Sequence, residues 1–305
     1  MDQGKRVGVF PSVVVSRGPG RLVSQPFNEY GGPLTLDLVV EQQKALPALL
    51  MQLAQEEGCQ TVEIRGGIGC EAMSGTDLCV RHPLHCYAVL KLYEKELMWL
   101  RSLTYEARKG VNRARRAGLT TEIRRGSRAV EDPFYTLYLK SMKRLGVPPH
   151  PQSFFVKLAE ELGDNVVAAW VMDKADLIGA LLGVVTGQRI HTLVTASDCR
   201  TWSMRPNDLA HWELIEWSIA AGLRLFDLGS VRYHGQYQFK RKWGASVEVY
   251  NCYCISQPGR ASAQPIQTIN SSGRFAVFMS SMWRGIVPTK LTAVLGPPIR
   301  RYLAK

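Results

Sequence analysis

Apolar residues recur along the chain in two ways, and each way predicts one type of element. Short stretches rich in β-branched and aromatic residues predict strands at 7–15, 22–26, 61–65, 87–90, 166–171, 177–185, 190–196, 225–228 and 247–254. Apolar residues three or four positions apart predict helices at 41–57, 94–117, 134–145, 153–162, 207–221 and 237–243. Strands and helices in this order are typical of a mixed α/β (α+β) sheet protein.

A similar order of strands and helices occurs twice along the chain, without visible sequence repetition. A chain of 305 residues is long enough for two domains of ordinary size. Asp132 and Pro133 open the second half as an N-cap followed by a first-turn proline. We therefore expect one α/β domain at 1–130 and another at 131–257, followed by a linker and a basic amphipathic tail at 258–305.

The chain is strongly basic, with 38 lysines and arginines against 26 acidic residues and a formal net charge of +12. This charge predicts attraction to nucleic acids, nucleotide phosphates or an anionic lipid surface. No acidic residue follows Glu248, so the tail is basic throughout, and we expect its segment 274–305 to contact an anionic membrane peripherally.

Three further features favour a cytoplasmic location, at most peripheral to the inner face of the membrane. The N-terminus lacks a secretory pattern, and no apolar run is long enough to span a bilayer. The seven cysteines are odd in number and irregularly spaced, which favours a reducing compartment. Cys70, Cys79 and Cys86 stand near His82 and His85 in the sequence. This group contains no Cys-x-x-Cys pair, so we expect no metal site there.

A cluster of basic residues follows the helix predicted at 94–117 through its end and beyond. Its members are Arg108, Lys109, Arg113, Arg115, Arg116, Arg124, Arg125 and Arg128. Cations stabilise the negative end of a helix, but one or two charges suffice for that. The cluster is therefore either a site for a ligand that carries phosphate or a plain solvated face.

Two adjoining motifs, Phe-Asp-Leu-Gly-Ser at 226–230 and Tyr-Gln-Phe-Lys-Arg-Lys-Trp-Gly-Ala at 237–245, carry the densest candidate chemistry. Asp227 ends a strand, where it either accepts a proton from an attacking amine or caps the following turn. Ser230 has no evident histidine partner, which argues against a serine nucleophile. Lys240 is expected where a helix begins, and there it either meets a phosphate or oxyanion or is an ordinary surface lysine.

The order Asp-x-Gly-Ser, then Gly-x-Tyr-x-Phe-Lys-x-x-Trp-Gly-Ala, resembles the FemAB-like branch of the GNAT acyltransferase superfamily. This branch holds the peptidoglycan-bridge aminoacyltransferases and FemAB-related proteins of exopolysaccharide and exosortase systems. Further matching pieces, in the same order, stand at 26–34, 63–65, 111–119, 134–155 and 206–212. The resemblance implies two GNAT-like domains with mixed central sheets. Because family members usually begin earlier, we expect the first domain to lack its first elements.

The resemblance also implies a reaction, the transfer of an activated acyl or aminoacyl group to an amine of a cell-envelope or exopolysaccharide precursor. In the family the Phe-Lys pair contacts the donor. The resemblance therefore implies that Phe239 lies beside the reacting carbonyl and that Lys240 binds the donor phosphate. Asp227 is the candidate base. The substrate-binding residues expected are Lys109, Arg113, Arg116, Tyr30, Gly31, Gly32, Arg144, His150, Ser230 and Tyr237.

Two departures from the family patterns narrow the substrates. The Arg/Gln-x-x-Gly-x-Gly/Ala loop that holds the pyrophosphate of CoA is missing. We therefore expect aminoacyl-tRNA or another phosphorylated acyl donor rather than acyl-CoA, and no tightly bound cofactor. His150 and Phe154 stand where bridge-forming enzymes tend to have Arg and Tyr, which argues against a peptidoglycan acceptor. The alternative function is a non-catalytic module that binds polyanions or a membrane surface.

Overall fold

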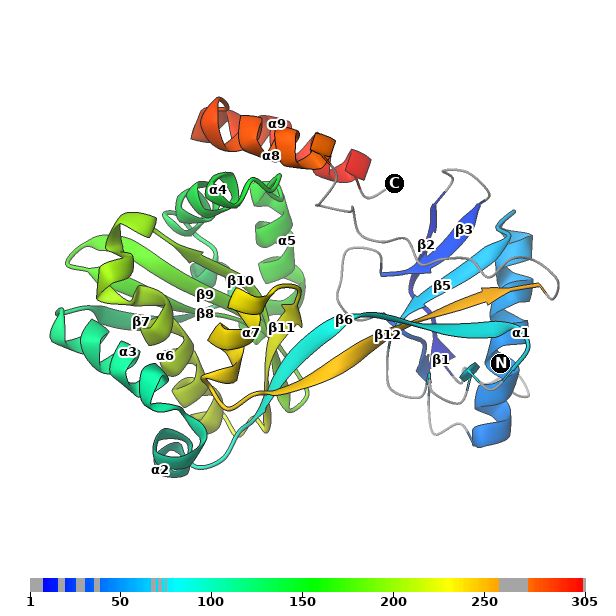
Figure 1. Cartoon of the computed structure of the whole chain (residues 1–305), viewed down its shortest axis with the longest axis horizontal. Coiled ribbons are helices and arrows are strands. Elements are labelled where there is room, and N and C mark those ends of the chain that lie inside the picture. Colours follow the sequence, from blue (N-terminus) through cyan, green and yellow to red (C-terminus); the bar gives the residue numbers. More distant parts are fainter. Residues whose placement is uncertain are drawn as a thin grey trace. The chain divides into compact units, whose positions relative to one another are not determined.

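The computed structural model describes residues 8–15, 20–25, 31–35, 39–66, 70, 73–74, 76–257 and 274–303. The chain packs as two units (Figure 1). Unit 1 combines residues 1–86 with 249–270 and 302–305, and unit 2 combines 87–248 with 271–301. Residues 87–130 thus pack with unit 2.

The described residues of unit 1 form one α-helix and strands of two sheets, one of which is the pair β1–β4. The elements of unit 1 are β1 (Gly8–Val9), β2 (Ser12–Val15), β3 (Arg21–Ser24), β4 (Leu34–Thr35), α1 (Val40–Glu56), β5 (Thr61–Arg65) and parts of β6 (Cys79–Lys91) and β12 (Ser246–Ser256). β3 is antiparallel to β2 and parallel to β5, and β12 is antiparallel to β5. The helix α1 buries Leu50, Met51 and Ala54 in the same core as Val62 and Ile64.

Unit 2 is larger and begins within β6. Its remaining strands are β7 (Thr120–Arg125), β8 (Val166–Asp173), β9 (Asp176–Thr186), β10 (Arg189–Ser197) and β11 (Leu225–Val231). Its helices are α2 (Lys95–Leu97), α3 (Tyr105–Arg116), α4 (Phe134–Leu145), α5 (Gln152–Leu162), α6 (Pro206–Ala220), α7 (His234–Arg241), α8 (Arg274–Gly285) and α9 (Thr289–Leu303). Neighbours from β7 to β10 are antiparallel, whereas β10 and β11 are parallel.

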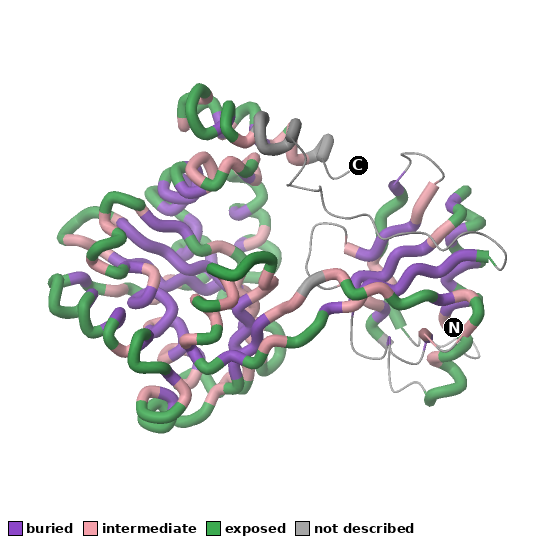
Figure 2. Tube along the Cα trace, in the orientation of Figure 1, coloured by how far each residue is buried: buried purple, intermediate pink, exposed green. Residues whose placement is uncertain are grey.

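The hydrogen-bonded strand order is β2-β3-β5-β12-β6-β11-β10-β9-β8-β7, so the prediction of a mixed sheet is confirmed. Helices cover both faces of the unit 2 sheet, and its strands are buried along much of their length (Figure 2). Successive side chains of a strand point to opposite faces. Accordingly Val167 and Ala169 of β8 join the core that includes α3 and α6, while Ala168 and Trp170 join the core of α4 and α5. Burial on both faces explains the continuous apolar run of β8.

The single helix predicted at 94–117 is wrong. The chain turns through α2 and a π-helical turn at Met98–Ser102, and Leu103 is extended. Thr104 then begins α3, because its hydroxyl accepts a hydrogen bond from the backbone amide of Ala107 (3.4 Å). The break separates Trp99 from α3, so that a cavity forms between them.

Of the predicted linker and tail, only the part from residue 274 can be compared with the structure. The linker expected at 258–273 lies outside the described residues, whereas α8 and α9 form two helices in unit 2. Within the described ranges, no helix has both the length and the apolar character needed to cross a membrane. Nor do three His, Cys, Asp or Glu side chains of the described residues gather where they could hold a metal ion.

Candidate functional site

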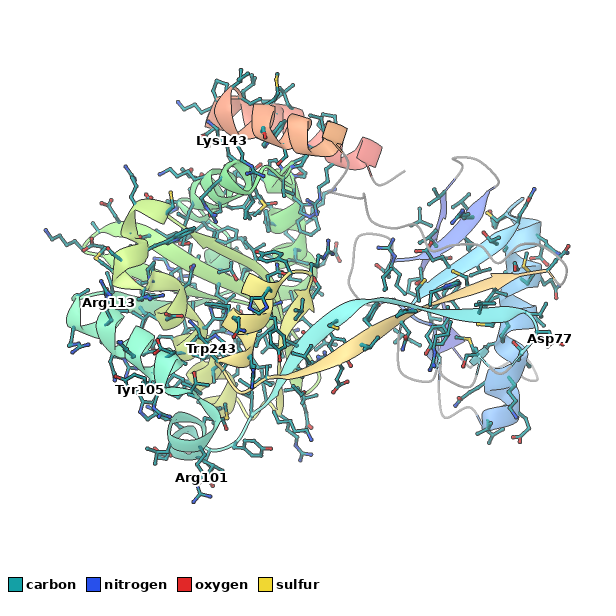
Figure 3. All side chains as sticks on the ribbon, viewed as in Figure 1. Asp77, Arg101, Tyr105, Arg113, Lys143 and Trp243 are labelled. Carbon is teal, nitrogen blue, oxygen red and sulfur yellow. The ribbon has the colours of Figure 1, made fainter. Side chains whose placement is uncertain are left out.

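A cavity of about 590 Å³ lies among α3, the start of α6 and α7, and we call it the α3–α7 cavity. Its lining residues are Thr104, Glu106, Lys109, Gly110, Arg113, Arg205, Asp208, Gln238, Phe239, Arg241 and Lys242. Five of these side chains are cationic and two are acidic, so positive charge is in excess. Figure 3 shows Arg113 on α3, within the larger unit. Such a lining favours an anionic ligand.

Lys242 and Asp208 form an ion pair at this cavity. The Asp208 side chain is 4% exposed, and the Lys242 ammonium lies 4.2 Å from the centre of the Phe239 ring. The hydroxyl and amide of Thr104 both donate to the backbone carbonyl of Lys242 (3.0 and 2.9 Å), which holds α7 beside α3. At Gly110 a Cβ atom would collide with the Asp208 carboxylate, so glycine permits this close approach.

Arg113 and Arg205 supply positive charge to the cavity that no described residue pairs with. In the part of the chain that the structure describes, neither side chain has a hydrogen bond or ion pair. Arg205 is also in the left-handed region, with φ +65°, immediately before α6. Such a backbone costs about 1 kcal/mol or more in a non-glycine residue and often marks a functional position.

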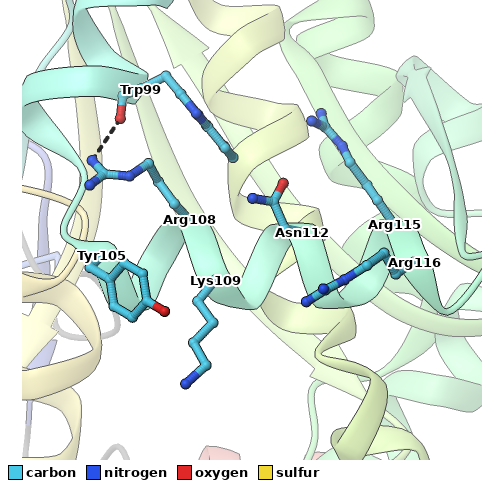
Figure 4. A pocket seen from close by; sticks show the side chains of 7 residues that line it. All are labelled: Trp99, Tyr105, Arg108, Lys109, Asn112, Arg115 and Arg116. Carbon is cyan, nitrogen blue, oxygen red and sulfur yellow. Dashed lines mark hydrogen bonds between the residues drawn. The ribbon is translucent and has the colours of Figure 1, made fainter.

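A second cavity, of about 670 Å³, lies along another side of α3 (Figure 4). Its lining residues are Trp99, Tyr105, Arg108, Lys109, Asn112, Arg115 and Arg116. The Arg108 guanidinium donates to the carbonyl oxygens of Trp99 and Leu103 (3.0 and 2.6 Å), and Arg115 pairs with Glu213 (3.1 Å). These two arginines therefore hold neighbouring elements together, whereas Lys109 lines both cavities.

The predicted basic cluster is thus divided among several surroundings. Arg113 lines the α3–α7 cavity and Arg116 the second cavity. Arg124 pairs with Glu122 (2.7 Å) and stacks on Trp170. The remaining members near the sheet do not line either cavity. Basic residues that are close in sequence therefore lie in different surroundings, and only some of them line a cavity.

Asp227 is buried where the parallel pairing of β10 and β11 ends, at the register His191–Asp227. Its carboxylate is 1% exposed and accepts hydrogen bonds from Arg189 (2.6 Å) and from the amide of Gly229 (2.7 Å), and His191 Nδ1 lies 3.1 Å away. This is the geometry of the turn-capping interpretation. The role of Asp227 as a base stays a prediction.

Lys240 lies in the last turn of α7, so its predicted place at the start of a helix is wrong. The helix begins at His234, and a cation near its negative end is stabilising. The Lys240 ammonium donates to the backbone carbonyl of Ser230 (2.6 Å), in the strand end that has left the β10 pairing. Phe239 lines the α3–α7 cavity and Lys240 does not, although the two are adjacent in sequence.

The other predicted residues lie outside the α3–α7 cavity. The Ser230 hydroxyl accepts a hydrogen bond from Arg232 (3.2 Å), and Tyr237 faces the Arg241 guanidinium at 5.9 Å. Gly31 belongs to unit 1, as does Gly32, and its amide donates to the carbonyl of Arg65 (2.8 Å).

Tyr30, Arg144 and His150 complete the predicted set. Tyr30 lies outside the described residues. Arg144 stacks on Trp202, 4.5 Å from the ring centre. The His150 ring stacks on Phe154 with centres 4.3 Å apart, and burial lowers the pKa of His150 to about 4. Arg144 and His150 thus belong to the α4–α5 region, away from Phe239.

His211 of α6 is buried behind the Phe239 ring. Its ring lies 4.9 Å from that of Phe239 and stacks on Trp243 at 5.6 Å. Its Nδ1 lies 2.7 Å from the carbonyl oxygen of Asn207, so Nδ1 carries the proton and donates. Burial lowers the pKa of His211 to about 3, and the nearby Lys242 and Lys240 act in the same direction.

The neutral His211 predicts a pH-dependent stability. Between the unfolded pKa of about 6.5 and the folded value of about 3, the unfolded chain binds a proton that the folded chain does not. The free energy of unfolding should therefore fall as the pH falls through this window, by up to about 1.4 kcal/mol per unit. Urea unfolding at about pH 7 and about pH 5 should show a loss about 2 kcal/mol larger in the wild type than in His211→Gln. Equal losses in the two proteins would show that His211 contributes nothing.

Residues 101–241 match the family of the acetyltransferase (GNAT) domain. This part of the chain is therefore similar to a GNAT domain. Every residue that lines the α3–α7 cavity lies in the matched part except Lys242, which follows it directly. Comparison with curated protein sequences gives no match.

The similarity to solved structures covers more of the chain than residues 101–241. The crystal structure of FemX superposes with a TM-score of 0.63 and 13% identity, over 85% of this chain and 87% of that one. The C-terminal domain of a putative lysylphosphatidylglycerol synthetase from Agrobacterium fabrum gives 0.61 and 12%, over 82% and 84%. L-PGS from Bacillus licheniformis gives 0.55 and 13%, over 92% and 85%. The resemblance to the FemAB-like branch of GNAT proteins is therefore confirmed for the fold.

Sequence reasoning missed most residues that line the α3–α7 cavity, among them Arg205, Asp208 and Lys242. Two signals could have indicated Asp208. A glycine inside a helix, here Gly110, often marks the close approach of another group. An acidic residue in the first turn of a helix that begins with proline, here Asp208, is held at a fixed place by the helix end.

Proposed function

We propose that the GNAT domain transfers an activated acyl or aminoacyl group from a phosphorylated donor to an amine, with the donor in the α3–α7 cavity. The observation that carries this proposal is the meeting of Phe239 with five cations in one cavity, two of which, Arg113 and Arg205, have no anionic partner among the described residues. A phosphate group would neutralise this charge through charge-assisted hydrogen bonds, which are stronger than hydrogen bonds between neutral groups.

The reaction forms an amide. The nitrogen of the amine attacks the acyl carbonyl carbon, a C–N bond forms, and the bond from that carbon to the donor oxygen or sulfur breaks. The proton lost by the amine leaves with the donor group or passes to water. The contribution of the protein is orientation: Phe239 lines the acyl group while Arg113, Arg205 and Lys109 hold the phosphate.

Lys242 and Lys240 take different parts in this proposal. Lys242 lies against the Phe239 ring and is paired with Asp208, so it places positive charge beside the reacting carbonyl. Lys240 is a positioning residue, since its ammonium ties α7 to the Ser230 carbonyl. Asp227 caps the turn at Gly229 and orders the end of β11.

Several features support an aminoacyl or other phosphorylated donor. The chain has no Gly-rich loop of the kind that holds CoA pyrophosphate. A neighbour in fold is named as a lysylphosphatidylglycerol synthetase, a name that describes an aminoacyl product. We propose aminoacyl-tRNA as the first donor to test and an amine of a cell-envelope or exopolysaccharide precursor as the acceptor. We also propose that each of the two units has a GNAT-like fold, while the domain limits at 130 and 257 stay predictions.

Arg113 and Arg116 offer a matched pair for a test, because both are exposed on α3 and they line different cavities. In an assay of amide product from labelled donor, Arg113→Gln should raise the KM for the donor about tenfold or more, as expected for a lost hydrogen bond between ions. Arg116→Gln should change it by less than about twofold.

The result that would overturn the proposal is equal behaviour of the two variants in this assay. The non-catalytic alternative predicts something different again, namely no amide product from the wild type with any donor.

A further inference from the structure

The helices α8 and α9 pack on the α4–α5 region through one face. A Cβ atom at Gly146 would collide with Ser280, and one at Gly296 would collide with Pro149, so both glycines permit close contact. Arg300 donates a hydrogen bond to the carbonyl of Pro148 (3.1 Å). Trp283 and Thr292 are buried. In Figure 1 the two helices lie beside α4 and α5, as these contacts require.

Apolar side chains of α8, of α9 and of the turn between them are exposed to solvent, and we call this set the outer face. Its members are Met282, Ile286, Leu291, Val294 and Leu295. Ile286 and Val294 are each 68% exposed. Leu291, Val294 and Leu295 are three and four positions apart in α9, which places them in one stripe, while Met282 lies in the last turn of α8 and Ile286 follows the end of that helix. A contiguous exposed apolar surface of this kind marks an interaction site.

The charge around the outer face selects among possible occupants. Arg284 and Lys290 are exposed on α8 and α9, and no acidic residue occurs in the chain after Glu248. Lys143 of the neighbouring α4 adds another cation (Figure 3). A second copy of the chain would bring cations against cations, which is unfavourable. Anionic lipid headgroups complement the cations, and acyl chains accommodate the apolar tips.

We propose that the outer face of α8 and α9 binds the anionic surface of a lipid bilayer, with the helices lying in the plane of the surface. The contact holds unit 2, and with it the GNAT domain, at the membrane. The proposal is independent of the acyl transfer reaction, because none of the outer-face residues lines the α3–α7 cavity.

Flotation of the full chain with vesicles tests this proposal. One set of vesicles holds equal parts of phosphatidylcholine and phosphatidylglycerol, and the other holds phosphatidylcholine alone. The wild type should float with the anionic vesicles and not with the neutral ones. Ile286→Ser combined with Val294→Ser should weaken binding at least about tenfold, and Lys290→Gln about fivefold.

Leu100→Ser is the matched control, since Leu100 is 69% exposed, lies in the same unit and is remote from α8 and α9 in sequence. It should bind as the wild type does. All variants should keep the wild-type melting temperature, because the altered side chains are exposed. Equal binding of wild type and double variant would overturn the proposal. So would a dimer in sedimentation velocity that the double variant abolishes, since the outer face would then be a contact between two copies.

Discussion

Replacing Lys242 with methionine should lower the free energy of unfolding by about 3–5 kcal/mol. The reason is that the carboxyl group of Asp208, which is almost fully buried, would lose its ionic partner. Removal of one member of a buried pair costs more than removal of both, because the cost comes from the unpaired charge. Urea unfolding of the purified variant at neutral pH measures the effect.

The control for this prediction is the double variant Lys242→Met with Asp208→Asn. Asparagine has nearly the shape of aspartate without its charge, so the double variant should recover much of the lost stability. If the single and double variants were equally destabilised, the loss would come from packing of the lysine side chain against Phe239 and Trp243 rather than from charge.

Phe239→Ala should lower kcat for acyl transfer roughly 100-fold, with a much smaller change in the KM for the donor. The phosphate-binding cations of the cavity remain in this variant, so the donor still binds. The acyl group loses the surface that orients it against the amine, and small displacements of reacting atoms have large effects on rate. Steady-state kinetics with the donor varied at saturating amine separates the two parameters.

Two further variants show whether this effect belongs to the site. Phe154→Ala removes a phenylalanine of the α4–α5 region that stacks on His150, and it should leave kcat within about twofold. Phe239→Leu keeps an apolar side chain of similar reach and should restore part of the rate. An equal loss of kcat in Phe154→Ala and Phe239→Ala would contradict the assignment of Phe239.

The fold could be predicted from the sequence to the extent that each element has its own local pattern. The strand at 166–171 is a continuous apolar run because it is buried on both faces, and its place was predicted correctly. β6 runs from Cys79 to Lys91 and is longer than the predicted 87–90. The prediction missed its first half because that half contains Pro83, and proline is uncommon inside strands. The helix break at Leu103 depends on a cap by Thr104, a weak local signal among helix-forming residues.

The site could be predicted only where its residues share a motif. Phe239, Arg113 and Lys109 were all expected to meet a substrate, and the structure brings them together in one cavity. Arg205 and Asp208 come from a distant segment and are brought there by the packing of α6 on α3, to which only the helical Gly110 and the place of Asp208 in the first turn of α6 gave a weak local signal. Lys240 lies in the last turn of α7 and Lys242 is the C-cap residue two positions later, so a small error in the helix bounds changes which of them is expected to face Phe239.

The central claim, that the α3–α7 cavity holds a phosphorylated acyl donor, is tested most directly by calorimetric titration of the full chain. Aminoacylated tRNA, uncharged tRNA, acyl-CoA and a UDP-sugar precursor would each be titrated at low and high salt, into the wild type and into Arg113→Gln. We expect one acylated donor to bind at a single site, to remain bound at high salt, and to bind at least about tenfold more weakly to Arg113→Gln. Weak, salt-sensitive binding of every polyanion, equal in the two proteins, would contradict the claim.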